Sequence, residues 1–257
     1  MTILISNENN IRIISLNRPE KLNAITLEMA TELNSAIQDA ANDAVVKCLV
    51  ITGKGRAFSS GGDVDEMGEY LPKAGDLFYK LTEQIHDSFS TLLTMPKPVL
   101  NSLNGIIAGG ALGIALAGDY RIANKSTKLL SAHFKRGFVP AGGATYILPR
   151  LIGLARTQTL FFGGKTLNSD EMLEWGLVHE VIEDEYLNER TMEIAQKLAD
   201  GPTNAIAETK KLLIDSDTLS LKQELEIERE KNKDSGNSGD AVEGIKAFIE
   251  KREPNFE

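Results

Sequence analysis

The chain has 257 residues, of which 42% are hydrophobic and 25% are charged, a balance typical of globular proteins. This length suits one large domain, or one domain with an appendage, and allows a substantial buried core. The net charge of -9 argues against a broad nucleic-acid-binding surface, because such surfaces are strongly basic.

The cysteine content and the apolar segments indicate the compartment. Cys48 is the single cysteine, so no internal disulfide can form, which fits a reducing environment. The first ten residues lack the basic and apolar regions of a signal peptide. The longest apolar-rich stretch, residues 106–117, is too short to cross a bilayer and contains several glycines. We expect a cytoplasmic protein with no membrane segment.

Strands and helices alternate in the first half of the chain. Thr26 is suited to cap a helix whose apolar residues recur on one face. Residues 45–52 form a continuous apolar run, which predicts a strand buried on both sides. The expected elements are strand 11–16, helix 27–41, strand 45–52, helix 76–94, strand 99–103, a Gly- and Ala-rich helix ending at 118, and strands 120–123 and 129–132.

From about residue 144 onward nearly every segment predicts helix. Asn168 precedes one helix with Glu171 at its third position, and Asp240 precedes the last with Glu243 likewise, both capping patterns. Strands and helices followed by helices alone predict an α/β core and a helical appendage. We place the core in residues 1–195 and the C-terminal helical region in residues 196–257.

Two glycine-rich loops, each following an apolar strand, are the strongest candidates for chemistry. They are GKGRAFSSGGD (53–63) and the segment around Gly109 and Gly110, which precedes a helical run. Glycine lets the backbone approach a ligand closely, and the first N–H groups of a helix lack internal partners. Two such N–H groups can stabilise a developing oxyanion.

Two other interpretations of these loops are tight turns with small residues for helix packing, and a nucleotide-binding fold. The turn interpretation remains open on glycine content alone. The nucleotide-binding interpretation is disfavoured, because neither loop contains G-x-G-x-x-G and the chain has no G-x-x-x-x-G-K-[ST].

Five stretches, in order, resemble the enoyl-CoA hydratase/isomerase (crotonase) superfamily over nearly the whole chain. They are LNRPEKLNAIT (16–26), VVKCLVITGKGRAFSSGGDVDEM (45–67), MPKPVLNSLNGIIAGGALGIALAGDYRIA (95–123), GFVPAGGATYILPRLIG (137–153) and GIKAFIEKREPNF (244–256). The resemblance implies an α/β fold, a crotonase-like spiral of ββα units with a helical C-terminal trimerisation region. It also implies a homotrimer or a dimer of trimers.

The resemblance further implies an acyl-CoA substrate, in which coenzyme A is part of the substrate and no cofactor is bound permanently. The N–H groups of Gly62 and Gly110 would form the oxyanion hole. Residues expected to frame the coenzyme A are Lys21, Ala24, Ala57, Ser60, Gly61 and Asp63. Lys21 is either a phosphate ligand or a solvated lysine, and Asp63 either borders the pocket mouth or caps a helix. No metal site is expected, since no ligand cluster has suitable spacing.

The chain departs from the family at its acid/base positions. Where relatives carry the two hydratase glutamates and an isomerase aspartate, this sequence has Gly113, His133 and Ala141. Proton transfer needs a titratable group near the substrate, and His133 is the only one of the three. It is either the proton carrier or an inert part of the pocket lining. His86, on the preceding helix, is expected by default to pack against that helix's neighbours, with a place facing the pocket as the alternative.

Three hypotheses follow. The first is an acyl-CoA enzyme working through a thioester enolate, with isomerisation or variant chemistry favoured over hydration because both glutamates are absent. The second is a catalytically silent acyl-CoA-binding homologue. The third is a structural oligomer without a ligand.

Overall fold

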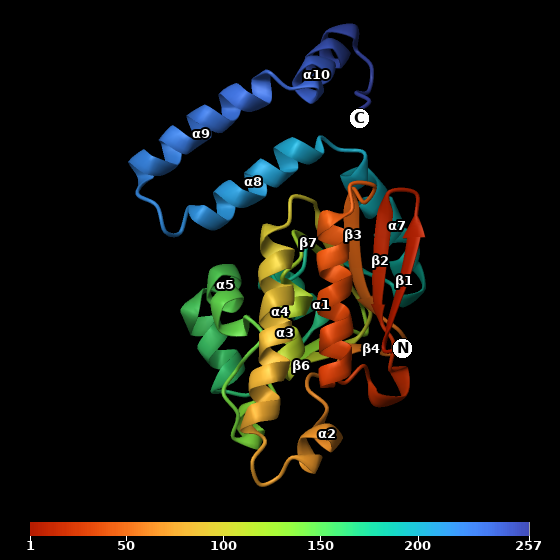
Figure 1. Cartoon of the computed structure of the whole chain (residues 1–257), viewed down its shortest axis with the longest axis vertical. Helices are drawn as coiled ribbons and strands as arrows, with labels where there is room; N and C mark the ends of the chain where they lie inside the picture. Colours follow the sequence, from red (N-terminus) through yellow and green to blue (C-terminus); the bar gives the residue numbers. More distant parts are fainter. Residues whose placement is uncertain (257) are drawn as a thin grey trace.

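The computed structural model of the chain describes residues 1–256 and contains two β-sheets covered by helices (Figure 1). The larger sheet, in spatial order, consists of β1 (Ile3–Glu8), β2 (Ile11–Leu16), β3 (Cys48–Gly53), β5 (Val99–Leu103), β7 (Tyr120–Asn124) and β10 (Glu180–Ile182). The smaller consists of β4 (Ala57–Ser59), β6 (Ile106–Ala108), β8 (Lys128–Leu130) and β9 (Thr166–Asn168).

From β3 to β8, consecutive strands alternate between the two sheets. β3, β5 and β7 are parallel neighbours in the larger sheet, while β4, β6 and β8 are parallel neighbours in the smaller. At least one helix follows each strand pair before the chain returns to the larger sheet. This repeated β-β-α winding is the spiral that the sequence predicted.

The helices of the core are α1 (Leu27–Asn42), α2 (Val64–Glu69), α3 (Gly75–Thr94), α4 (Leu112–Leu116), α5 (Ala144–Phe161), α6 (Ser169–Glu174) and α7 (Leu187–Ala199). α1 begins at Thr26, whose hydroxyl accepts the N–H of Met29 at 3.2 Å as predicted. α1 and α3 lie side by side over the larger sheet (Figure 1).

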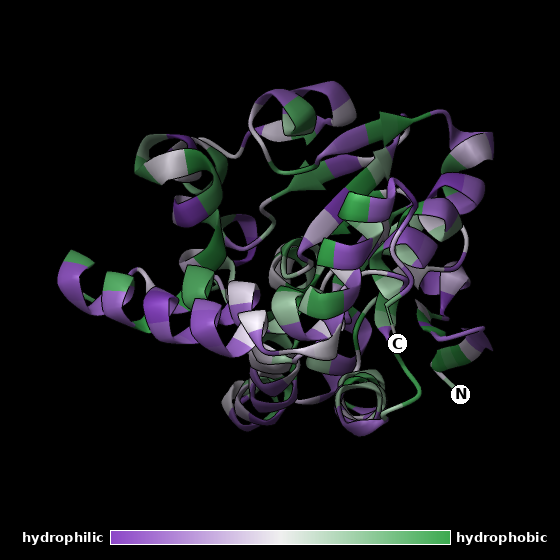
Figure 2. Cartoon of the chain, turned by 90° about the horizontal axis from the view of Figure 1, so that it is seen from above, coloured by the Kyte–Doolittle hydropathy of each residue, from purple (hydrophilic) through white to green (hydrophobic). Residues whose placement is uncertain are grey.

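The larger sheet is buried on both faces. Leu49 and Ile51 of β3 belong to the main core, whereas Cys48 and Val50 belong to a second cluster that also contains Leu187 and other residues of α7. A strand covered on both faces needs apolar side chains at every position, which is why this run does not alternate. Seen from above, the outer helices carry both hydrophobic and hydrophilic residues (Figure 2), as expected for helices with one face on a sheet.

The last three helices, α8 (Thr203–Asp215), α9 (Leu221–Gly236) and α10 (Gly239–Glu250), extend away from the core (Figure 1). An ion pair anchors α8: the buried Lys210 donates to the carboxylate of the more exposed Asp119 at 2.8 Å and to the carbonyl of Leu92 at 2.6 Å. Burial raises the pKa of Asp119 and lowers that of Lys210, and their mutual attraction offsets part of both effects. The expected domain boundary at residue 195 lies inside α7.

Several predicted elements have different limits in the structure. β3 begins at Cys48 rather than residue 45, because Val45 is a solvent-exposed turn residue. The Gly- and Ala-rich helix is only a 3-10 turn, η2 (Gly109–Ala111), followed by the short α4. The last helix is capped by Ser238, whose hydroxyl accepts the Ala241 N–H, so the assignment of Asp240 as its cap was wrong.

Candidate active site

A cavity of about 770 Å³ opens beside the two glycine-rich loops. Four groups of residues line it. The first wall comes from residues 18–26 and 57–67, and the second wall from residues 131–143. α3 and the glycines Gly109 and Gly110 form the remaining sides. The lining residues are Lys21, Ala24, Ser60, Gly62, Asp63, Val64, Asp65, Met67, Gly75, Phe78, Tyr79, Leu81, Thr82, His86, Gly109, Gly110, Ala132, His133, Arg136, Gly137, Phe138, Val139, Pro140 and Ala141.

The first wall is built around Asn23, which is fully buried and has a left-handed backbone conformation, with φ 52°. Its amide nitrogen donates to the carbonyl oxygens of Lys54 (2.9 Å) and Ala57 (2.8 Å), and its oxygen accepts the N–H of Arg18 (2.8 Å). Asn is among the few residues that adopt this conformation at low cost. One side chain therefore joins residues 18–26 to β4.

Ala57 and Gly61, both expected beside coenzyme A, lie beneath the cavity surface rather than on it. Ala57 is buried in β4, where its carbonyl accepts two side-chain amides. Gly61 donates its N–H to the Ser59 hydroxyl at 3.2 Å and accepts the Ile25 N–H at 2.8 Å. These two residues shape the first wall from behind, whereas the cavity lining contains the other predicted framing residues, Lys21, Ala24, Ser60 and Asp63.

Within residues 1–256, the N–H groups of the two predicted oxyanion donors, Gly62 and Gly110, donate to no other residue. A parallel bridge joins Ile25 to Gly62, and its hydrogen bonds use the carbonyl of Gly61 and the N–H of Asp63. The N–H of Gly62 therefore takes no part in the bridge. Gly110 lies in the first turn of η2, where N–H groups have no intrahelical acceptor.

The two glycine loops are packed against each other. A Cβ placed on Gly61 would lie 2.8 Å from the carbonyl oxygen of Ala108 and 3.3 Å from the nitrogen of Gly110. The φ of Gly61 is +91°, so a side chain would also strain the backbone there. Gly62 and Gly110 thus reach one cavity from adjacent loops, and the oxyanion-hole assignment stays a prediction with compatible geometry.

His133 belongs to the second wall, directly before the 3-10 helix η3 (Phe134–Arg136). Only 6% of its surface is exposed, and its Nε2 has no hydrogen-bond partner among the described residues. Its Nδ1 lies 3.4 Å from the Ser131 hydroxyl. Burial lowers the pKa of His133, and the nearby charge of Arg136 lowers it further.

Gly113 has no room for a side chain. A Cβ there would overlap the carbonyl oxygen of Gly142 and would lie 3.3 Å from the ring of Phe89. The backbone of the second wall therefore fills the space where hydratase-like relatives are expected to place a glutamate. Ala141, at the expected isomerase position, lines the cavity without any titratable group.

His86 has a different environment from the default one predicted. Instead of packing among helices, it is an exposed residue of α3 that lines the cavity. Its Nε2 accepts the N–H of Gly142 at 3.1 Å, so it braces the second wall against α3. No sequence signal distinguished this contact from ordinary helix packing.

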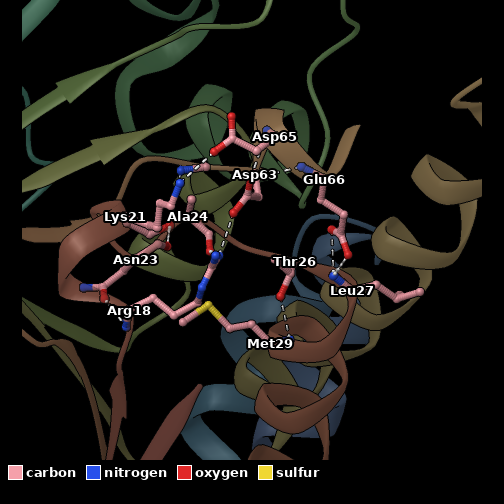
Figure 3. Close-up of polar contacts among 12 residues, drawn as sticks. Arg18, Lys21, Asn23, Ala24, Thr26, Leu27, Met29, Asp63, Asp65 and Glu66 are labelled. Atoms are coloured by element: carbon pink, nitrogen blue, oxygen red, sulfur yellow. Dashed lines mark hydrogen bonds and ion pairs between the residues drawn. The ribbon is translucent and has the colours of Figure 1, made fainter. Parts of the chain in front are cut away.

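Asp63 caps α2 and also borders the cavity (Figure 3). Its carboxylate accepts the N–H groups of Asp65 (3.0 Å) and Glu66 (3.2 Å) and the guanidinium of Arg18 (2.7 Å). Burial favours a higher pKa for Asp63, but these hydrogen bonds outweigh it and the pKa is lowered. The two interpretations of Asp63 are therefore compatible.

Lys21 and Glu66 complete the polar contacts of the first wall (Figure 3). Lys21 forms an exposed ion pair with Asp65 at 2.8 Å at the edge of the cavity. The carboxylate of Glu66 accepts the N–H of Leu27 at 3.1 Å, away from the cavity lining. Burial raises the pKa of Glu66. The hydrogen bond from Leu27 to this carboxylate ties α2 to α1.

Within residues 1–256, no group of three or more His, Cys, Asp or Glu side chains is arranged to hold a metal ion. None of the helices described in this range combines the length and hydropathy that a bilayer span requires.

Comparisons with known proteins agree with this fold. Residues 6–257 match the model of the enoyl-CoA hydratase/isomerase family. The 1,2-epoxyphenylacetyl-CoA isomerase of Escherichia coli (strain K12) is 34% identical over 97% of this chain and 95% of its own. The trans-2-decenoyl-[acyl-carrier-protein] isomerase of Streptococcus mutans is 33% identical over 99% and 97%, respectively.

Solved structures give the same result. An enoyl-CoA hydratase from Bacillus anthracis has a TM-score of 0.93 at 29% identity and covers 100% of this chain and 99% of its own. An enoyl-CoA hydratase from Polaromonas sp. JS666 has a TM-score of 0.94 at 27% identity, with 99% of each chain covered. The chain belongs to the enoyl-CoA hydratase/isomerase family and has its crotonase fold, which confirms the family and fold predicted from sequence.

Proposed function

We propose that the cavity binds an acyl-CoA thioester, with its carbonyl oxygen between the N–H groups of Gly62 and Gly110. The observation that carries this proposal is the pair of adjacent glycine loops, which bring two backbone donors to one cavity. Donors of this kind stabilise the enolate that forms when a proton leaves the α-carbon, and removing one typically costs about 100-fold or more in rate.

We further propose that His133 carries the proton. An isomerisation moves one proton off the substrate and returns one elsewhere, so a single imidazole near the acyl chain can serve as base and then as acid. His133 is suited to this because it lines the cavity and is the only titratable residue among the three expected acid/base positions. Its Nε2 is buried and has no partner among the described residues. Isomerisation or related enolate chemistry therefore fits this cavity better than hydration, which uses two carboxylates in this family.

The test is turnover of 3-enoyl-CoA and 2-enoyl-CoA substrates by the purified protein and its His133→Gln variant. We expect isomerisation, with loss of about 100-fold or more in kcat for the variant, in the range of general-base effects. His86→Gln is the matched control, because it replaces another imidazole of the same cavity. Unchanged turnover by His133→Gln would end the proton-carrier assignment.

The pH dependence follows from the lowered pKa of His133. The base must be neutral, and burial together with Arg136 keeps it neutral below the usual imidazole pKa. We expect kcat/KM to stay level down to about pH 6.5, the ordinary histidine value, and to fall only below it. This acidic limb should be absent from the residual activity of His133→Gln.

A catalytically silent acyl-CoA binder is the second candidate, motivated by the missing carboxylates at Gly113 and Ala141. Calorimetry that shows tight binding of acyl-CoA, combined with no turnover across a broad panel of thioesters, would favour it. Absence of any acyl-CoA effect on Tm would instead favour a structural protein without this ligand.

We also propose that the protein assembles as a homotrimer or a dimer of trimers through its C-terminal helices, and that it works in the cytoplasm. Several large apolar side chains of α8–α10 are exposed in the single chain, which supports an assembly that covers them. They are Leu213, Leu221, Leu225, Val242, Ile245, Phe248 and Ile249. Sedimentation of the purified protein, with a Phe248→Glu variant for comparison, tests the assembly.

A further inference from the structure

The charged side chains of the cavity are paired within the protein, with one exception. Asp63 pairs with Arg18 at 2.7 Å, and Lys21 pairs with Asp65 at 2.8 Å. Arg136 lines the same cavity but forms no ion pair with any residue in the described range. Its one side-chain hydrogen bond runs from Nη1 to the carbonyl oxygen of Ala132 at 3.2 Å.

Arg136 lies on the second wall, whereas the ion-paired Lys21 lies on the first. Arg136 ends η3, three residues after His133 and two before Phe138. Phe138 meets Phe78 of α3 edge to face, with ring centroids 5.0 Å apart, so the second wall and α3 touch there. Tyr79, Leu81 and Val139 make this part of the lining largely apolar. Arg136 is thus an unpaired cation at the rim of an apolar region.

An arginine in this setting is suited to bind an anion. Its planar guanidinium matches a carboxylate or phosphate with two parallel hydrogen bonds, and such charge-assisted bonds are stronger than neutral ones. Arg136 is solvent-exposed, so an anion binds it in competition with water, and the two parallel hydrogen bonds supply the selectivity. The hydrogen bond to Ala132 uses one of the five N–H donors and leaves the others available.

We propose, building on the function proposed above, that Arg136 recognises an anionic group of the thioester ligand. Two sources supply this chemistry: a carboxylate at the far end of the acyl chain, or a phosphate of the coenzyme A. Arg136 lies on the second wall in the short 3-10 helix that directly follows His133, the proposed proton carrier, and this favours the carboxylate. The favoured substrate class is therefore a dicarboxylic acid joined to coenzyme A at one end.

The experiment is calorimetric binding of three probes to the full-length protein: free coenzyme A, hexanoyl-CoA and hexanedioyl-CoA. The two thioesters have the same chain length and differ by the terminal carboxylate. Each is measured with wild-type protein, Arg136→Met, Arg136→Lys and Lys135→Met. Lys135 is the matched control, because it neighbours Arg136 but does not line the cavity.

We expect Arg136→Met to raise the Kd of hexanedioyl-CoA by about 10- to 100-fold, as for loss of a charge-assisted hydrogen bond. The Kd values of the other two probes should stay unchanged. Arg136→Lys should retain part of the preference, and Lys135→Met all of it. An equal weakening of all three probes assigns Arg136 to a phosphate instead. The inference is overturned if Arg136→Met changes none of them, or if Lys135→Met acts equally. If wild-type protein binds no probe, the proposed function itself has failed.

Discussion

On the first wall, Asn23 and the charged side chains that line the cavity have partners within the protein, whereas the second wall leaves His133 Nε2 and the charge of Arg136 without one in the described residues. The hydrogen bonds of the first wall are already formed without a ligand. The second wall is held by close glycine packing, by the contact of Phe138 with Phe78 and by the hydrogen bond to His86.

This difference separates polar groups that hold the fold together from polar groups that have no protein partner and can interact with a ligand. A buried polar atom without a partner carries a free-energy cost, so its persistence at a cavity is a reason to suspect a ligand. Asn23 and Asp63 are as polar as His133 and Arg136, but their hydrogen-bonding capacity is largely used internally. The second wall is accordingly where we expect chemistry, and the first where we expect positioning.

The largest effect should come from adding one methyl group to α4, where it packs against the second wall. Gly113→Ala places a Cβ where the carbonyl oxygen of Gly142 lies, so the backbone must shift. We expect a loss of about 3 kcal/mol or more in the free energy of unfolding, measured by urea titration. Gly68→Ala is the control, because a Cβ there meets nothing within 4 Å. Equal stability of both variants would mean that the second wall is not closely packed.

An intermediate effect should follow from removing the amide donor of the first wall. Asn23→Asp keeps the shape and the left-handed backbone but leaves the carbonyls of Lys54 and Ala57 facing a carboxylate. We expect a loss of about 2 kcal/mol, the typical cost of buried groups left unsatisfied. Asn9→Asp makes the same change at an exposed residue of similar φ, 51°, and should be nearly silent.

The smallest effect should arise at the edge of the first wall. Lys21→Met removes an exposed ion pair, so stability should hardly change, while the Kd for coenzyme A should rise severalfold and respond less to salt. Lys125→Met is a matched control: its pair with Asp170 has similar exposure, 48% and 72% against 51% and 78%, but lies outside the cavity. Identical Kd values for both variants would remove Lys21 from the ligand site.

The order of strands and helices in the core could largely be predicted from sequence. Continuous apolar runs marked the buried strands, and Thr26 and Asn168 marked helix starts that the structure contains. Five strands were missed: β1, β4, β6, β9 and β10. All but β1 have three residues, too few to show a readable alternation. Their pairing depends on neighbouring strands far along the chain, which local pattern cannot supply.

The candidate site was only partly predictable. Glycine spacing and the family resemblance pointed to Gly62, Gly110 and His133, which line the same cavity. Nothing in the sequence indicated that the carbonyl of Gly142 fills the space beside Gly113, or that Arg136 lacks an ion-pair partner in the described residues. Both properties depend on which side chains and backbone atoms meet across the fold, and residue types alone do not determine that.

The lone thiol offers a practical consequence. Cys48 is fully buried in β3, and burial raises its pKa to about 12, so almost no reactive thiolate exists in the folded protein. Because the chain has no second cysteine, labelling by a thiol reagent reports one event, the opening of the central strand. The rate of that labelling thus gives a built-in measure of how often the spiral comes apart, without any engineered probe.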